Sequence, residues 1–442
     1  FSLIASLYLV YDLNIIIVLA SCIAAGFLVA IFSYIISQPS QKYGLPFPVI
    51  LRSSFGIAGA RYIAMLRGVV GMFMFGVQTF FISKSIGYLI RIFIFNTNAT
   101  ILENEMFLVF LMGMDLIDWF SFIFTLLIQF YLFKQGQNFI KYILNFSAWF
   151  VYTGLVVFII ILAGENSKEI ISAFKLSVST ENLVSKQNLL TLISLTGTLF
   201  AFFSIVILNI GDFSRYVKNS SENFYGNLSL IINLLIFSFA SVFIVIGADI
   251  VMAKKMLEVD QLLTNPTDII GKIDNSFLTI IAILFIIVAS GSTNLIANYI
   301  PAQNVLLNFS PKNFDKSSSG LLIVIIGLIF GALWLPILSQ SGALSIIDTI
   351  GSFFGPIAGV IIADYYLIKN KEYISKEIFS DLKKGAYFYS GGWQIKGLYS
   401  MIIGFIFAAS TIWNVDLRFL QSFAWLIGAF ISYITYYLLA SD

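Results

Sequence analysis

The sequence predicts an all-α membrane protein that crosses the bilayer many times. Hydrophobic residues make up 59% of the 442 residues and charged residues 11%, whereas soluble domains are about half apolar and a quarter charged. Apolar runs of about 20 residues, the length that spans a bilayer as a helix, recur along the whole chain. So little charge leaves too few polar groups to coat a water-facing surface, which excludes the soluble and the disordered classes.

The spans follow from the apolar runs and the polar breaks between them. Helix is the element expected, because backbone polar groups in lipid must bond within the chain and these runs are too long for barrel strands. We expect one half-span and eleven complete spans, at residues 1–10 (the half-span), 14–37, 62–88, 116–134, 138–163, 190–211, 227–252, 276–299, 319–338, 345–368, 398–414 and 417–439. The chain begins with Phe1 inside an apolar run. We therefore expect the natural N-terminus to lie upstream and the half-span to complete a twelfth helix.

The loops predict the orientation. Most of the 25 lysines and arginines fall in one set of alternate loops, which includes Lys134, Arg215 and Lys312. The loop at 97–115 belongs to the other set and has acidic residues but no basic one. Because the basic loops of membrane proteins stay in the cytoplasm, we expect a multi-pass cell-membrane protein with both termini cytoplasmic.

One loop differs from the others. Residues 38–61 contain three prolines and no acidic residue, and Pro46 and Pro48 hold the chain extended. The stretch VILRSSF that follows them can form a short helix in the membrane interface. A plain basic connector is the alternative.

Several functions are excluded by what the sequence lacks. There is no histidine, and the net charge of +2 is too balanced for nucleic-acid binding. Cys22 is the single cysteine, so no intrachain disulfide can form. We expect it to be a small hydrophobic residue of the core. No nucleotide-binding motif, metal-ligand cluster or nucleophile arrangement is present. We expect neither an enzyme nor an organic cofactor.

Polar residues are concentrated in the span at 276–299. Ser290, Ser292, Thr293 and Asn294 surround a glycine, and Asn298 follows one helical turn later. Hydroxyl and carbonyl oxygens suit an alkali cation. Small residues also allow helices to pack closely, and the residues alone leave both readings open.

Two other spans carry candidate substrate residues. Gln78 places an amide inside the span at 62–88, with Met74 one turn before it, and an amide suits a planar, amide-like solute. An interhelical hydrogen bond is the alternative. Gly197 and Thr198 interrupt the apolar span at 190–211, which suggests a broken helix of the kind that holds transporter substrates, and Phe203 follows with a ring that can stack. Core packing is the alternative for the ring.

Four stretches together resemble nucleobase–cation symporter family 1, the hydantoin, allantoin, uracil and cytosine permeases. They lie at 42–81, 208–218 (LNIGDFSRYVK), 290–312 and 351–369. The resemblance implies a leucine-transporter-type fold of two five-helix inverted repeats plus two helices. These would be residues 1–163, with an incomplete first helix, then 190–369, then 398–442. One bundle would rock against the other around a midplane site.

The resemblance also implies roles for individual residues. The implied sodium ligands are Ala289, Ser292 and Thr293, with the rest of that site upstream of residue 1. The implied substrate residues are Gln78, Asn298, Met74, Phe203 and Ser204. Met74 departs from the family because many members have tryptophan there, which puts aryl-hydantoin substrates in doubt. Gly211 departs from the common proline and should loosen the end of its helix.

The function that follows is import of a neutral nucleobase or related ring amide by symport with Na⁺, by a protein expected to be a monomer in the lipid bilayer. Proton coupling on the same fold is one alternative, because some relatives are thought to use it. An uncoupled channel or receptor is another. Neither alternative changes the expected fold.

Overall fold

The computed structural model describes residues 14–177, 185–254, 276–340 and 349–441. The described residues are helical apart from loops and two isolated bridges. Within the described residues, ten helices are long and apolar enough to cross a membrane, and α12 is a shorter apolar helix. Each of the eleven complete spans expected from the sequence corresponds to one of these. The half-span at 1–10 lies outside the described residues.

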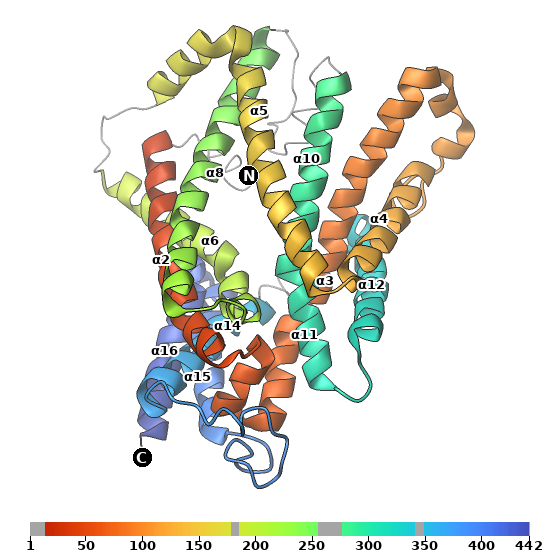
Figure 1. The fold of residues 1–442 in the computed structure, drawn as a ribbon. Coiled ribbons are helices and arrows are strands. Elements are labelled where there is room, and N and C mark those ends of the chain that lie inside the picture. The colour runs from red at the N-terminus through yellow and green to blue at the C-terminus, as the bar shows by residue number, and fades with distance from the viewer. Residues whose placement is uncertain (1–13, 178–184, 255–275, 341–348, 442) are drawn as a thin grey trace.

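The helices follow one another as shown in Figure 1. Their bounds are α2 (Ile15–Tyr43), α3 (Phe47–Asn98), η1 (Ala99–Glu103), η2 (Glu105–Phe107), α4 (Leu116–Lys134), α5 (Gln137–Ser177), α6 (Lys186–Leu208), α7 (Gly211–Ser214), α8 (Ser220–Lys254), α10 (Ser276–Asn294), η3 (Leu295–Tyr299), α11 (Ile300–Phe309), α12 (Lys316–Ala332), η4 (Trp334–Leu338), α14 (Phe354–Ala363), η5 (Asp364–Ile368), α15 (Ile395–Trp413), η6 (Val415–Phe423) and α16 (Ala424–Ala440).

The helices pack in two groups that are joined at one end. In the first group α2 packs against α6 and α8. In the second group α3 packs against α4, α10, α11 and α12. Helix α5 contacts both α8 and α10, while α14, α15 and α16 pack together and α14 also touches α3 and α6. The chain ends at the end of the molecule where α14–α16 lie, which we call the C-terminal end (Figure 1).

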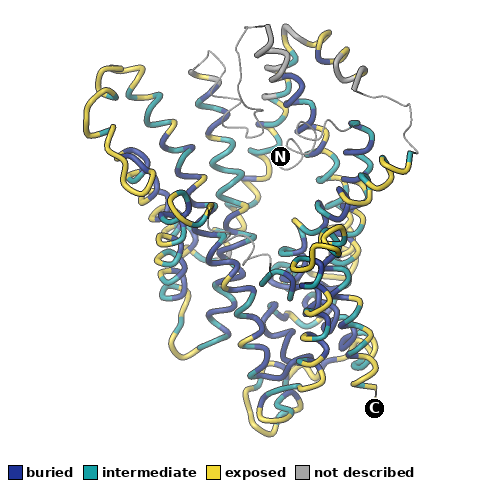
Figure 2. The backbone as a smooth tube through the Cα atoms, turned by 180° about the vertical axis from the view of Figure 1, so that it is seen from behind, coloured by how far each residue is buried: buried dark blue, intermediate teal, exposed yellow. Residues whose placement is uncertain are grey.

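Burial is greatest toward the C-terminal end (Figure 2). A large apolar core there combines residues of α2, the start of α3, α6, α14 and α16, including Ile36, Phe55, Phe200, Ile361 and Trp425. The second group has its own core around Phe75, and the first group has a smaller one around Cys22, which is fully buried as expected. The two groups are thus packed most firmly together at the C-terminal end.

Helix α3 includes the short helix predicted from VILRSSF. The chain turns at Gly56, whose φ of 80° is left-handed, and then continues as the membrane span. A side chain at Gly56 would overlap the carbonyl of Gly392, so glycine is required both by the backbone angle and by this close approach. Phe47, Leu51 and Phe55 are buried, and the Phe55 carbonyl accepts from the Gln394 N–H just before α15. The placement of this helix at the membrane interface stays a prediction.

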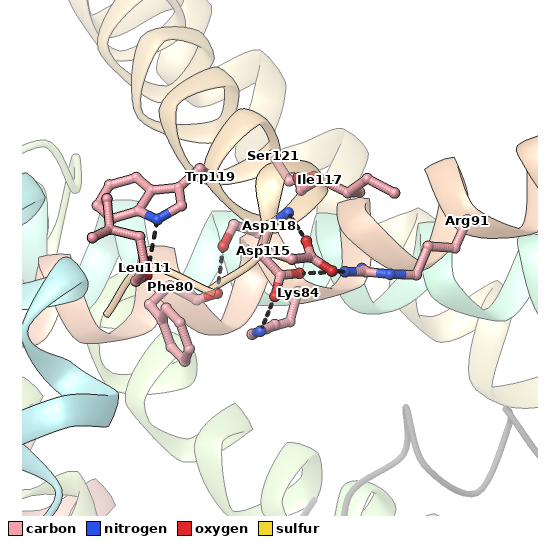
Figure 3. Close-up of polar contacts among 10 residues, drawn as sticks. Phe80, Lys84, Arg91, Leu111, Asp115, Ile117, Asp118, Trp119 and Ser121 are labelled. Carbon is pink, nitrogen blue, oxygen red and sulfur yellow. Dashed lines mark hydrogen bonds and ion pairs between the residues drawn. The ribbon is translucent and has the colours of Figure 1, made fainter. Parts of the chain in front are cut away.

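The far end of α3 extends beyond the expected limit at residue 88. Lys84 pairs with Asp118, and Arg91 Nη2 donates to Asp115 Oδ2 at 2.6 Å and to Asp118 Oδ1 at 3.0 Å (Figure 3). Asp115 also caps α4 by accepting from the Asp118 N–H at 2.8 Å. These ion pairs allow two basic residues to lie on an apolar helix, and they fasten α3 to α4.

The expected break at Gly197 and Thr198 is also wrong. Helix α6 continues through both residues to Leu208 and ends at Asn209. Glycine is present at 197 because a Cβ there would lie 2.8 Å from the Cβ of Ser422. The interruption in hydropathy therefore marks close packing against η6 and not a break.

Candidate functional site

Gln78 and Asn298 meet where α3 crosses the end of α10. Asn298 Nδ2 donates to Gln78 Oε1 at 2.9 Å, and Gln78 Nε2 donates to the Ser290 carbonyl at 3.1 Å. Asn298 is buried and Gln78 is half-buried. The structure therefore brings the two predicted amides together and places both beside the hydroxyl-rich stretch.

A π-helical turn, Leu295–Tyr299, carries Asn298. The residue after it explains this turn. Pro301 has no N–H, so Ala297 lacks the donor that an α-helix would give its carbonyl, and the proline ring would also clash with that carbonyl. The helix widens instead, and the Ile300 N–H bonds to the Leu295 carbonyl five residues back. Single π turns of this kind are frequent at functional sites.

A second row of polar side chains supports the amide pair. Asn298 Nδ2 also lies 2.9 Å from Asn294 Oδ1, and Asn294 Nδ2 donates to Thr79 Oγ1 at 3.0 Å. Thr79 Oγ1 in turn lies 2.8 Å from Gln129 Oε1 on α4. The row joins α10, α3 and α4 and fixes the orientation of Asn298. Sequence analysis missed Thr79 and Gln129, although an intramembrane glutamine such as Gln129 was itself a visible signal.

The predicted cation ligands lie on α10, about one and a half to two and a half turns before Asn298. Ser292 Oγ and Thr293 Oγ1 both approach the Ala289 carbonyl, at 3.0 and 2.9 Å. Both hydroxyls donate to this carbonyl, as serine and threonine commonly do within a helix. Neutral hard oxygens are also the donors that an alkali cation prefers. Among the described residues, no three histidine, cysteine or acidic side chains lie close enough to form a metal site of another kind. The donor set fits Na⁺, although three oxygens are too few to complete its shell.

The remaining predicted substrate residues are less closely connected to the amide pair. Met74 and Phe203 are half-buried, and both pack against the core at the C-terminal end. Ser204 is buried, and its hydroxyl donates to the Ala201 carbonyl at 2.6 Å. No hydrogen bond within the described chain joins Ser204 to Gln78 or Asn298. Its place in a substrate site stays a prediction.

A buried polar cluster that the sequence analysis missed lies between the amide pair and the C-terminal end. Arg67 is fully buried on α3 and donates from Nη2 to the Ala297 carbonyl and from Nε to Asn209 Oδ1 at 3.0 Å. Asp212, also buried, accepts at 3.0 Å from the N–H of Phe47, the first residue of α3. Burial raises the pKa of the Asp212 carboxyl to about 6, against the lowering effects of this N–H, Arg215 and Arg67. The sign of this cluster in the sequence was Arg67, a basic residue within an expected apolar span.

Gly211, beside this cluster, has a different role from the one expected. It does not simply loosen the helix end, because α2 approaches here so closely that a side chain at 211 would overlap the Ser40 hydroxyl. The glycine lets α7 pack against α2 and so places Asp212 at the start of α3.

The model of one protein family matches residues 2–438, almost the entire chain. Its description is permease for cytosine/purines, uracil, thiamine and allantoin. The chain belongs to this permease family. The resemblance found in four sequence stretches is thereby confirmed, and so are the multi-pass membrane location and the expectation that the chain is not an enzyme, because the family consists of permeases.

Individual relatives are distant but extensive. The chain is 26% identical to the purine-uracil permease NCS1 of Arabidopsis thaliana over 88% of this chain and 62% of that one. It is also 26% identical to the allantoin permease of Bacillus subtilis, over 90% of this chain and 78% of that one. The chain therefore spans less than two thirds of the length of the plant permease.

Solved structures support the fold. Mhp1, a nucleobase-cation-symport-1 family transporter solved in a closed conformation with bromovinylhydantoin bound, aligns with a TM-score of 0.68 at 17% identity, covering 97% of this permease and 85% of that chain. A Na⁺-coupled sialic acid symporter aligns with a TM-score of 0.54 at 14% identity, covering 95% and 89%. The all-helical, leucine-transporter-type fold expected from the resemblance is confirmed.

Proposed function

We propose that this permease is a secondary active transporter that imports a neutral nucleobase or a related ring amide, such as uracil, cytosine, allantoin or hydantoin. The observation that carries the proposal is the pairing of Gln78 with Asn298 on a π turn inside the membrane span. In place of the direct bond between them, the two amides would bond to a substrate that presents an N–H beside a C=O. The names of the relatives agree with this substrate class.

The coupling ion in this proposal is Na⁺. Ala289, Ser292 and Thr293 offer neutral oxygens on α10, and Gln78 bonds to the carbonyl of Ser290 within the same stretch. A cation there would order the stretch on which Gln78 depends. Sodium would therefore raise substrate affinity, and the substrate would raise sodium affinity by the same factor. Met74 and Phe203 would cover the ring, and Ser204 would lie at its edge.

Transport would follow alternating access between the two helix groups. The group of α2, α6 and α8 would move against the group of α3, α4 and α10–α12. Each group takes helices from both of the expected repeats, 1–163 and 190–369, and residues 398–442 lie outside the repeats. The C-terminal end would be cytoplasmic, because Lys42 in the last turn of α2 and Lys371 and Lys383 in the loop before α15 lie there. The protein would act as a monomer.

The test is uptake of labelled uracil, cytosine, allantoin and hydantoin into proteoliposomes, with Na⁺ in one set and choline in the other. Saturable uptake of at least one compound that depends on Na⁺ is the expected result. Saturable uptake that is equal in choline contradicts sodium coupling, and no uptake of any of the four contradicts the substrate class.

Proton coupling is a second candidate because of one observation. Asp212 is buried, its Oδ2 has no partner in the described structure, and its pKa is raised to about 6, so it can exchange a proton near neutral pH. Uptake measured against external pH at fixed Na⁺ separates the candidates. Stimulation by acid without any effect of Na⁺ favours the proton, and the reverse favours sodium.

A further inference from the structure

Arg67 is costly to bury, and its position requires a reason. The side chain is fully buried, Nη1 has no partner, and no carboxylate of the described chain lies within ion-pair distance of it. A buried charge without such a partner usually destabilises a fold by several kcal/mol. A hydrophobic residue would fill the same space in a span at no such cost. The contacts of Arg67 therefore indicate a function other than stability.

The first contact of Arg67 is with the π turn. Its Nη2 donates to the carbonyl of Ala297, the residue before Asn298. This is the carbonyl that Pro301 leaves without its α-helical donor. Arg67 thus supplies the hydrogen bond that the widened turn lacks.

Glycines on α3 make this contact possible. A Cβ on Gly71 would lie 3.0 Å from the Asn298 carbonyl oxygen and 3.1 Å from Arg67 Nη1, so both groups occupy the space above this glycine. A Cβ on Gly68 would lie 2.8 Å from Val305 Cγ1 of α11. The π turn and α11 therefore rest directly on the α3 backbone, and the guanidinium lies beside them.

The second contact of Arg67 is with the other helix group. Its Nε donates to Asn209 Oδ1 at 3.0 Å, and Asn209 ends α6. Three residues later, Asp212 bonds to the start of α3. One side chain on α3 therefore joins the turn that presents Asn298 to the point where α6 stops, at the firmly packed end of the molecule.

From this arrangement we infer that Arg67 is a positioning residue that holds the π turn in the shape that presents Asn298 and fastens this turn to the end of α6. The inference rests on the proposed function and adds a coupling to it. Closure of the two helix groups at the C-terminal end keeps Asn298 in place, and separation of the groups releases it. A lysine carries its three donors on a single nitrogen and so cannot reproduce the spacing between the Nε and Nη2 donors that makes the two contacts.

Two measurements test the inference in the full chain, purified into nanodiscs. The first is the affinity for uracil and for allantoin, from ligand-dependent shifts in the unfolding temperature. Whichever of the two probes binds the parent should bind Arg67→Met about tenfold more weakly. Arg67→Lys should weaken binding by a smaller factor. Asn209→Leu, which breaks the link to α6 but leaves the Ala297 contact intact, should also weaken it, by a smaller factor than Arg67→Met. Arg61→Met is the matched control, because Arg61 is a half-buried arginine on the same helix whose ion pair is with Asp381 and which has no bond to the π turn or to α6, and it should leave the affinity unchanged.

The second measurement needs no substrate. Cys22→Ala removes the native thiol and Asn304→Cys introduces a reporter beside Asp212, where a bulky maleimide should react slowly in the parent. Both Arg67→Met and Asn209→Leu should increase the labelling rate several-fold from the side of the C-terminal end, and Arg61→Met should not.

The outcomes separate the inference from the proposed function. If neither probe binds the parent, the proposed substrate class is wrong, and the labelling rates still decide whether Arg67 joins the groups. Unchanged labelling in both Arg67→Met and Asn209→Leu overturns the inference. The inference is also overturned if Arg67→Met binds the probe with the same affinity as the parent. If Arg67→Met does not fold, Arg67→Lys is measured in both assays instead. A probe affinity and a labelling rate that both equal those of the parent then overturn the inference.

Discussion

The bond from Asn298 Nδ2 to Gln78 Oε1 satisfies two amides inside the membrane spans at the same time. Gln78 and Asn298 were recognised because uncharged polar residues in an apolar span need a partner. Arg67, Asn209 and Asp212 were not assigned any role, because their contacts join positions more than a hundred residues apart and no local pattern reveals them. One clue was present in the sequence. Pro301 follows Ala297 by four residues, which predicts a displaced carbonyl.

Gln78→Ala and Asn298→Ala should each weaken substrate binding by about 1–3 kcal/mol, because each leaves a buried polar partner unsatisfied. The measurement is the dissociation constant of the best compound in the uptake panel. Gln135→Ala, an exposed amide at the end of α4, is the control and should bind like the parent. Parental affinity in both site variants would place the pocket elsewhere.

Asp212→Asn should alter the dependence of stability on pH. The folded pKa of about 6 lies above the ordinary value of 3.8, so the folded protein holds this proton more tightly than the unfolded chain. The stability from this group is therefore complete below about pH 4 and is lost as pH rises to 6, a change on the order of 3 kcal/mol at about 1.4 kcal/mol per pKa unit.

Unfolding temperatures from pH 4 to 7 test this prediction. The asparagine can still accept from the Phe47 N–H, so the variant should fold and lack this part of the decline. Asp416→Asn, at an exposed position on η6, should keep the parental profile. Identical profiles for Asp212→Asn and the parent would show that Asp212 is already ionised at pH 4.

At the scale of elements, hydropathy located every complete span but not the helix ends and irregular turns within or beside the spans. It could not distinguish Gly197, which is a packing contact, from a helix break, because both appear as a small residue in an apolar run. It ended α3 ten residues early, because the ion pairs of Arg91 with Asp115 and Asp118, which let the helix continue, join α3 to another helix. Helix ends and breaks depend on tertiary partners.

Pro301→Ala should remove the cause of the π turn. Ala297 regains an α-helical donor, so the π turn can return to a regular α-helix. Losing the extra residue of the π turn rotates Asn298 around the helix axis by up to about 100°. We expect probe affinity to fall by about tenfold while the unfolding temperature of the free protein stays the same or rises. Pro48→Ala, in the first turn of α3 where proline costs no hydrogen bond, should leave affinity unchanged. Parental affinity in Pro301→Ala would mean that Arg67 alone maintains the turn.

Gly359→Ala should destabilise the contact of α14 with α16, because a Cβ there would overlap the Ala429 carbonyl. Overpacking of this kind costs about 1–3 kcal/mol. Gly226→Ala on α8 is the matched control. No atom lies within 4 Å of its Cβ position, and alanine favours helix by up to about 1 kcal/mol. The unfolding temperature should fall in the first variant and stay equal or rise in the second.

At the scale of the whole molecule, the fold class followed from composition and the fold type from the four family stretches. The grouping of helices did not follow from the residues, because lipid-facing and protein-facing sides of a span are both apolar. The structure adds that the second group contains both the amide pair and the predicted cation oxygens, on α3 and α10. The amides and the ion oxygens would then belong to one body, while Phe203 and Ser204 on α6 of the other body would close over the substrate.

Because the two sites share α10, their coupling must be reciprocal. If 100 mM Na⁺ in place of choline lowers the dissociation constant of the transported compound by some factor, saturating compound must lower the apparent sodium constant by that same factor. Thr293→Ala should raise the sodium concentration needed for half-maximal binding several-fold and leave substrate affinity at saturating Na⁺ within about twofold. Thr198→Ala, on α6 away from the predicted ion site, is the control. A loss of substrate affinity in Thr293→Ala that saturating Na⁺ cannot restore would show that Thr293 serves the substrate or the fold and not the ion.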